Sequence, residues 1–154
     1  MMIKIYTDGA CRRNPGPGGW CALILIKDHK PIGIKGREAH TTNQRMELKA
    51  VLHGLKYLKD QHYKGNIPHK VIVCTDSIYV SDAFNKDWIG TWKSNGFRKA
   101  HRNKPIKNQD LWRELIMVAE SIDKLEFQHV QAHSGDPFND FVDGIAKEMA
   151  CHTR

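Results

Sequence analysis

Two aspartates follow short β-rich runs in the same way. Asp8 comes directly after residues 3–7 and Asp76 directly after residues 70–75, and a small residue follows each of them. If the two runs are parallel neighbours in a sheet, their carboxyl ends meet at one edge, and the two carboxylates lie side by side. Taken singly, either aspartate has a simpler explanation, because Asp is common in the turns and helix caps that follow strands.

Two further acidic residues lie in segments with helical periodicity. Glu47 flanks the apolar stripe of residues 48, 51, 52 and 55, although interaction with the helix dipole would also explain a glutamate near a helix start. Asp143 flanks the stripe of the last predicted helix, whereas Asp140 projects away from it, so Asp143 is preferred as the fourth acid. That stripe consists of Phe138, Phe141, Val142, Ile145, Ala146 and Met149.

Four carboxylates brought together would repel one another and raise one another's pKa values, so the cluster needs cations. Ligands that are all oxygen favour Mg²⁺ or Mn²⁺ over zinc. Two such ions about 4 Å apart can activate a water and stabilise the leaving oxygen of a phosphodiester. We therefore predict that Asp8, Glu47, Asp76 and Asp143 hold two divalent ions, with Mg²⁺ as the cofactor and Mn²⁺ as a substitute.

These positions depend on an α/β architecture. β-branched runs predict strands, and apolar residues at helical spacing predict helices, the first with Thr42 or Asn43 as its N-cap. The glycine- and proline-rich residues 14–19 are predicted to form a turn or loop. The order of elements predicts a five-stranded mixed sheet with helices on both faces. We expect strands at residues 3–7, 20–27, 32–38, 70–75 and 125–130, and helices from 43 for about four turns and at 77–84, 87–93, 110–121 and 137–149.

Gly144 follows Asp143 inside the last predicted helix. A glycine there costs on the order of 1 kcal/mol relative to alanine. It would either loosen the neighbouring carboxylate or leave room for a loop.

Composition limits the class of protein. The 154 residues, 40% of them hydrophobic, suit a single domain over residues 1–154 that needs no oligomerisation, so we expect a monomer. The four cysteines form no C-x-x-C pair, and no apolar run approaches the roughly 18 residues that span a bilayer. We expect a reduced, cytoplasmic protein without a membrane partner.

The net charge of +7 favours a polyanionic partner. Residues 86–107 contain seven basic residues against the single acid Asp87, which gives +6, and Trp88, Trp92 and Phe97 are interleaved with them. Such a segment predicts phosphate contacts of nucleic acid, although a solvated surface with tryptophans in the core is the alternative. The basic residues are Lys86, Lys93, Arg98, Lys99, Arg102, Lys104 and Lys107.

Five motifs in order resemble those of type 1 ribonuclease H. They are T-D-G at 7–9, N-P-G-P-G-G at 14–19, T-N-Q-R-M-E-L at 42–48, T-D-S at 75–77 and H-S-G-D-P at 133–137. The similarity extends over residues 3–150. It implies the ribonuclease H-like fold and hydrolysis of the RNA strand of RNA/DNA hybrids, leaving 5′-phosphate and 3′-hydroxyl ends. It also assigns metal positions to Asp8, Glu47, Asp76 and Asp143.

The resemblance implies further roles outside the carboxylates. His133 corresponds to a histidine that assists proton transfer or product departure. Thr42 and Asn108 correspond to a pocket that grips a phosphate of the DNA strand, and the basic segment corresponds to a handle on the hybrid, with Trp88, Trp92, Lys93, Arg98 and Lys99 as its contacts. Contacts with the RNA 2′-hydroxyl groups, which DNA lacks, fall to Cys11, Asn14, Asn43 and Gln44.

Two other functions remain open at this point. Another metal-dependent nuclease of the same fold, such as an integrase, a resolvase or a reverse-transcriptase domain, would use similar carboxylates. A module that binds hybrids without cutting them would use the same polar surface. The specific loop and helix motifs count against the first, and the complete set of four acids counts against the second.

Overall fold

The computed structural model describes residues 2–99 and 104–151, so Arg102 of the predicted basic segment lies outside the described residues. Apolar periodicity and β-branched runs produce the expected order of elements. The strands are β1 (Met2–Cys11), β2 (Gly16–Leu25), β3 (Ile32–Thr41), β4 (Lys70–Thr75) and β5 (Leu125–His129). The helices are α1 (Asn43–Lys56), its π-helical continuation η1 (Tyr57–Tyr63), α2 (Ile78–Asn85), α3 (Trp88–Asn95), α4 (Gln109–Glu120) and α5 (Pro137–Cys151).

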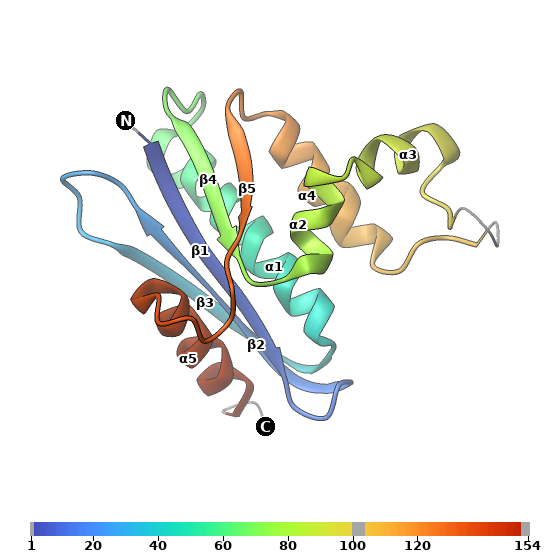
Figure 1. Cartoon of the computed structure of the whole chain (residues 1–154), viewed down its shortest axis with the longest axis horizontal. Coiled ribbons are helices and arrows are strands. Elements are labelled where there is room, and N and C mark those ends of the chain that lie inside the picture. The colour runs from blue at the N-terminus through green and yellow to red at the C-terminus, as the bar shows by residue number, and fades with distance from the viewer. Residues whose placement is uncertain (1, 100–103, 152–154) are drawn as a thin grey trace.

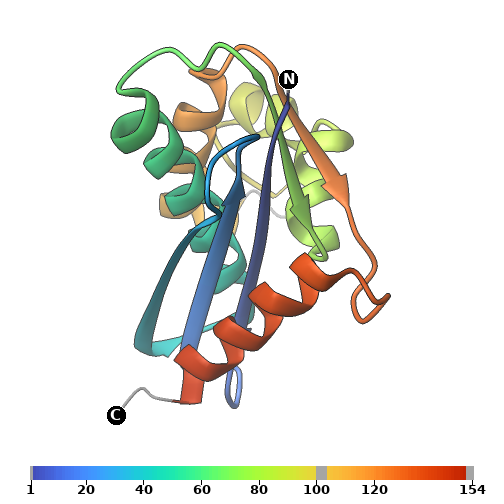
Figure 2. The same ribbon diagram turned by 90° about the vertical axis from the view of Figure 1, so that its left-hand side faces the viewer.

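The five strands form one mixed sheet in the order β3-β2-β1-β4-β5. β1 pairs antiparallel with β2 and parallel with β4, and β5 continues the parallel part beyond β4. Helix α5 lies across one face, whereas α1, α2 and α4 lie on the other (Figures 1 and 2). The predicted mixed sheet with helices on both faces is therefore confirmed.

Alternate residues of β1 face two separate cores. Ile3 and Ile5 pack with α1 and α4 in the larger core, whereas Tyr6 packs with Val142 of α5 in the smaller one. Both faces of the central strands are covered, and residues 71–75 of β4 are all buried. This burial on both sides explains why the β4 run is almost continuously apolar.

The prediction of a loop at residues 14–19 is wrong for residues 16–19. β1 continues beyond Asp8 to Cys11, and β2 already begins at Gly16. A side chain at Gly19 would lie 2.5 Å from the carbonyl oxygen of Ala146 and 2.5 Å from the Cβ of Met149. The glycine is therefore required by the close approach of α5 to the strand, and the chain turns only between β1 and β2.

The predicted apolar stripe of α5 also needs correction. Phe138 and Phe141 are 40% and 48% exposed, and the buried residues are Asn139, Val142, Ala146 and Ala150. The buried face contains small side chains because α5 lies so close to the glycines of β2. Asp143 is half-buried at the edge of this face and Asp140 is exposed, so the prediction that Asp140 projects away is confirmed.

Gly144 has no packing role among the described residues, because a side chain there would meet no atom within 4 Å. Helix α5 continues through it without a break. No described loop lies close enough to need the room that the glycine leaves, and the glycine lowers the intrinsic stability of the helix beside Asp143.

Within the described part of the chain, the helices are too short or too polar to cross a membrane.

Candidate active site

Strand register places the two aspartates next to each other. The parallel pairing of β1 with β4 ends at Thr7 opposite Thr75, so Asp8 and Asp76 are the next residues on neighbouring strands. Helix α1 brings the third acid, because a side chain at Gly9 would lie 2.4 Å from the backbone nitrogen of Glu47. The glycine lets the first turns of α1 rest on β1.

The carboxylates of Asp8, Glu47 and Asp76 converge, with one oxygen of each within 4.8 Å of the others. The backbone N–H of Gly9 donates to both Asp8 Oδ1 (2.9 Å) and Glu47 Oε1 (3.1 Å). Burial raises the pKa of Asp8 to about 7, and the charges of Asp76 and Asp143 add to the rise. Burial also raises the pKa values of Glu47 and Asp76, with neighbouring carboxylates adding to both shifts.

This arrangement fits a hard cation. Glu47 Oε2 is buried and has no hydrogen-bond partner among the described residues, although a buried carboxylate oxygen normally has one. The converging ligand atoms are all carboxylate oxygens, which suit Mg²⁺ and Mn²⁺. A divalent ion would supply both the missing partner and the missing positive charge.

Asp143 lines the same hollow as these three acids, a space of about 700 Å³. One of its oxygens, Oδ2, lies 3.0 Å from the ammonium of Lys147, one turn further along α5. Sequence reasoning missed Lys147, although an acid and a lysine at i and i+4 of a helix is a recognisable pattern.

His133 lines the hollow from the loop between β5 and α5. It is exposed and has a positive φ of 57°. Asp136 holds the end of this loop, because its Oδ2 accepts from the Tyr6 hydroxyl (3.2 Å) and its Oδ1 accepts from the backbone N–H of Phe138 (3.0 Å). Asp136 therefore fixes the start of α5, a positioning role that the sequence did not indicate.

The residues predicted to contact RNA gather around the start of α1. Asn43 and Gln44 are exposed and line the hollow. Asn14 lies beside them, and its Oδ1 accepts from the backbone N–H of Asn43 (3.0 Å). Cys11 also lines the hollow, but its thiol donates to the carbonyl oxygens of Gly16 (3.4 Å) and Thr41 (3.3 Å).

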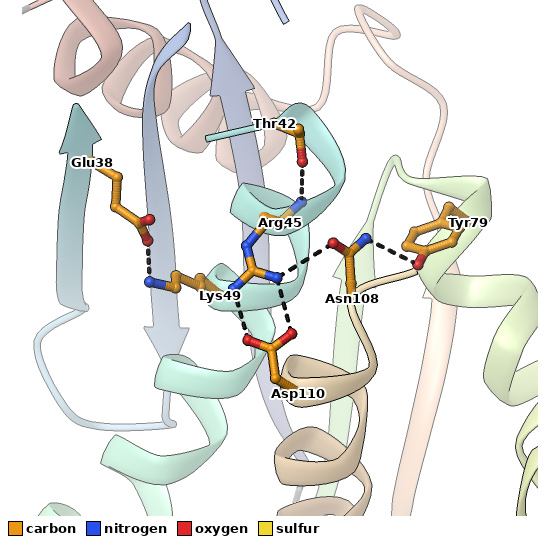
Figure 3. A network of polar contacts seen from close by, with 7 residues as sticks. All are labelled: Glu38, Thr42, Arg45, Lys49, Tyr79, Asn108 and Asp110. Carbon is orange, nitrogen blue, oxygen red and sulfur yellow. Dashed lines mark hydrogen bonds and ion pairs between the residues drawn. The ribbon is translucent and has the colours of Figure 1, made fainter. Parts of the chain in front are cut away.

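Thr42 and Asn108 belong to one polar network at the starts of α1 and α4 (Figure 3). Thr42 caps α1 by accepting from the backbone N–H of Arg45 (3.3 Å). The Arg45 guanidinium donates to both oxygens of Asp110 (3.0 and 2.8 Å) and to Asn108 Oδ1 (3.4 Å). Asn108 in turn donates to the Tyr79 hydroxyl (3.4 Å).

Arg45 and Asp110 were missed by sequence reasoning because they are 65 residues apart in the chain. Hydrogen bonding to Arg45 lowers the pKa of Asp110 to about 2, so the pair stays ionised across the physiological range. The bidentate contact fixes α4 against α1. Arg45 contacts both Thr42, through its backbone N–H, and Asn108, through its guanidinium.

The basic segment begins at Lys86, directly after α2, and continues through α3, which projects beyond the sheet (Figure 1). Trp88 and Trp92 are half-buried and pack against the main core, and the ring centroid of Trp92 lies 5.0 Å from that of Trp112. The tryptophans are therefore partly structural. They also line a second hollow of about 510 Å³ together with Arg98 and Lys99.

Gln44 lines both hollows, which shows that the carboxylate site and the basic segment border one another. Lys93 does not line the second hollow; its ammonium forms an ion pair with Glu120. Within the described residues, the basic side chains of this segment that line the second hollow are those of Arg98, Lys99 and Lys107.

A mixed sheet in this order, with carboxylates at the junction of its two central parallel strands, defines a nuclease of the ribonuclease H-like fold. The RNase H family model matches residues 2–151. The ribonuclease H of Caldicellulosiruptor saccharolyticus is 46% identical over 147 residues, covering 96% of this chain and 94% of the relative. The ribonuclease H of a Thermus thermophilus strain is 43% identical over 148 residues, covering 96% and 83%.

Solved structures agree on the fold. LC9-RNase H1, a type 1 RNase H with the type 2 active-site motif, matches with a TM-score of 0.82 at 23% identity, over 99% of this chain and 74% of that one. LC11-RNase H1, in complex with RNA/DNA hybrid, matches with a TM-score of 0.73 at 21% identity, over 97% and 96%. The chain belongs to the ribonuclease H family, and within it to type 1.

The raised carboxylate pKa predicts a specific pH dependence in metal-free protein. Between pH of about 4 and about 7, the folded chain keeps a proton on Asp8 that the unfolded chain has released, so the free energy of unfolding falls as pH rises. Asp8→Asn removes this effect. In EDTA, urea unfolding should show a stability advantage of Asp8→Asn over wild type that grows across this range to at least about 1 kcal/mol.

The matched control is Asp140→Asn, because Asp140 is exposed on α5. Its stability difference from wild type should not change with pH in this way. An advantage of Asp8→Asn that is the same at pH of about 4 and about 7 would contradict the burial argument.

Proposed function

We propose that the chain hydrolyses the RNA strand of RNA/DNA hybrids with a pair of Mg²⁺ ions and leaves 5′-phosphate and 3′-hydroxyl ends. As a member of the ribonuclease H family it is a metal-dependent endonuclease. The observation that carries the metal proposal is the convergence of Asp8, Glu47 and Asp76 around a buried carboxylate oxygen without a partner.

Asp8, Glu47, Asp76 and Asp143 are proposed to hold the ions. When bound, the ions supply a nucleophilic water and stabilise the leaving oxygen of the phosphodiester. The carboxylates would hold the ions in fixed positions because their backbones are packed together. Asp8 and Asp76 follow the paired strands β1 and β4, and Glu47 lies on α1, whose backbone rests on Gly9. Mn²⁺, which accepts the same oxygen ligands, is expected to substitute.

His133 is proposed to move a proton during hydrolysis or product departure. Three features support this role: it lines the hollow of the carboxylates, its side chain is exposed, and its loop contains Gly135 at a positive φ of 88°. The fixed end of the loop at Asp136 limits its movement to the residues around His133.

Discrimination for RNA is proposed to come from Asn14, Asn43 and Gln44 at the start of α1. Their amide groups can hydrogen-bond to 2′-hydroxyl groups, which DNA lacks. Asn43 and Gln44 are exposed in the hollow, whereas Asn14 acts partly by holding the backbone of Asn43. Cys11 is also proposed as a contact because it lines the hollow. Its thiol already donates to backbone carbonyl oxygens.

The DNA strand is proposed to bind along the network of Figure 3 and the basic segment. Thr42 and Asn108, which both contact Arg45, would bind one phosphate, while Trp88, Trp92, Arg98 and Lys99 line the neighbouring hollow. Lys93 is proposed as a weaker contact because Glu120 already pairs with it.

All these residues belong to a single chain, which supports a monomeric enzyme. The four free cysteines support a reducing compartment such as the cytoplasm.

A cleavage assay separates this function from its alternatives. With Mg²⁺, the chain should cut the RNA strand of a labelled RNA/DNA hybrid and leave RNA and DNA duplexes intact, and EDTA should abolish cutting. Asp76→Asn should lower the rate roughly a hundredfold or more because one fixed charge at the reacting phosphate is lost. Asp140→Asn is the matched control and should cut at nearly the wild-type rate.

Binding of the hybrid without cutting would favour the non-cleaving module. Cutting of DNA duplexes would favour a different nuclease of the same fold. Normal activity of Asp76→Asn would contradict the metal assignment.

The basic segment predicts a salt-dependent affinity. Replacing Lys93, Arg98 and Lys99 with alanine should weaken hybrid binding in EDTA and flatten the plot of log affinity against log salt by about two in slope, since Lys93 contributes least. The control replaces Lys27, Lys30 and Lys64, exposed lysines that line neither hollow. An equal loss of slope in both triple variants would mean that only overall charge matters.

A further inference from the structure

Helix α5 places a cation inside the carboxylate site. Lys147 lines the same hollow as Asp8, Glu47, Asp76 and Asp143, and its ammonium lies 3.0 Å from Asp143 Oδ2. Arg12 also lines this hollow. Among the described residues, Lys147 is the cation that forms an ion pair with one of the four acids. Among the four acids, Asp143 is therefore the one that the described residues pair with a cation.

The four acids differ in a second way. Asp8, Glu47 and Asp76 form the group of converging ligand atoms among the described residues, and Asp143 lies outside that group. An ion that binds the first three meets no competing lysine or arginine ion pair among the residues that the structure describes. An ion that uses Asp143 must displace the ammonium of Lys147 from it.

Lys147 is suited to being displaced. Its side chain is 59% exposed, so moving the ammonium into water costs little, and its unbranched stem has several free rotations. An arginine that gripped both oxygens would be harder to remove. Lysine therefore neutralises Asp143 without blocking it permanently.

We propose that Lys147 is a positioning residue that occupies Asp143 as a tethered cation until a divalent ion replaces it. This inference rests on the proposed metal site. In consequence the ion held by Asp143 binds more weakly than the carboxylate alone would allow, because that ion must first displace the Lys147 ammonium. Removal of Lys147 should therefore strengthen metal binding, the opposite of what loss of a merely structural lysine would do.

The test is a calorimetric titration of the substrate-free chain with Mn²⁺. The binding step that is lost in Asp143→Asn is the one that belongs to the ion held by Asp143. Lys147→Met should tighten this binding by about two- to fivefold, the range expected for an exposed ion pair. Lys147→Arg keeps the charge and should not tighten it. Thermal melting in EDTA checks that each variant is folded, and Lys147→Gln is a second neutral variant.

Lys86→Met is the matched control. Lys86 forms an i,i+4 ion pair with Asp82 on α2 (3.4 Å), with a similarly exposed lysine and a similarly half-buried acid, but neither residue lines the hollow. Mn²⁺ binding should be unchanged in this variant. Unchanged or weaker binding in Lys147→Met, or equal tightening in Lys86→Met, would overturn the inference. If Asp143→Asn loses no Mn²⁺ binding, the proposed ligand set fails instead.

Discussion

The parallel pairing of β1 with β4 is the constraint on which the site depends. It ends at Thr7 and Thr75, and the next residue on each strand is an aspartate, so the two carboxylates are neighbours for as long as the sheet is intact. The helices then complete the cluster at points of very close packing. Because Gly9 has no side chain, α1 with Glu47 packs directly on β1. Gly19 allows the same close approach of α5, which carries Asp143. The backbone therefore holds together charges that would otherwise separate.

The clustered carboxylates that the proposed metal site requires also lower the stability of the metal-free fold. Burial and mutual repulsion raise the pKa values of Asp8, Glu47 and Asp76, so these carboxylates without a cation weaken the fold at neutral pH, where metal binding requires their charged form. Polar groups elsewhere help to hold the helices. The Arg45–Asp110 contact and the capping of α5 by Asp136 keep the surrounding helices in place around the four carboxylates. A bound divalent ion would stabilise the protein and activate the site through the same contacts.

Much of this could be predicted from the sequence, for identifiable reasons. Strands such as β4 and helices such as α1 have strong local periodicity, and their bounds were predicted to within a few residues. The errors arose where a contact between distant segments decides the structure. Residues 16–19 look like a loop, but they form a strand that pairs with β1 and β3, and their glycines allow α5 to pack directly on Gly19. In the predicted stripe of α5, Val142 and Ala146 are buried as expected, whereas Phe138 and Phe141 are exposed. The small Ala150, which the stripe did not include, is buried as well.

The site shows the same division. Strand ends and helical wheels predict the four acids, and the family resemblance implies roles for Thr42 and Asn108. Arg45 and Asp110 could not be paired from the sequence, since nothing local connects two residues so far apart. Lys147 was detectable in principle from its spacing to Asp143, but only the structure shows that its ammonium lies in the hollow of the acids.

Anomalous diffraction from crystals of the chain grown with Mn²⁺ tests the central claim most directly. We expect an ion bound to carboxylate oxygens of Asp8, Glu47 and Asp76, with Glu47 Oε2 gaining the partner that it lacks in the described residues. Manganese bound elsewhere, with these three carboxylates still contacting only protein, would contradict the metal site.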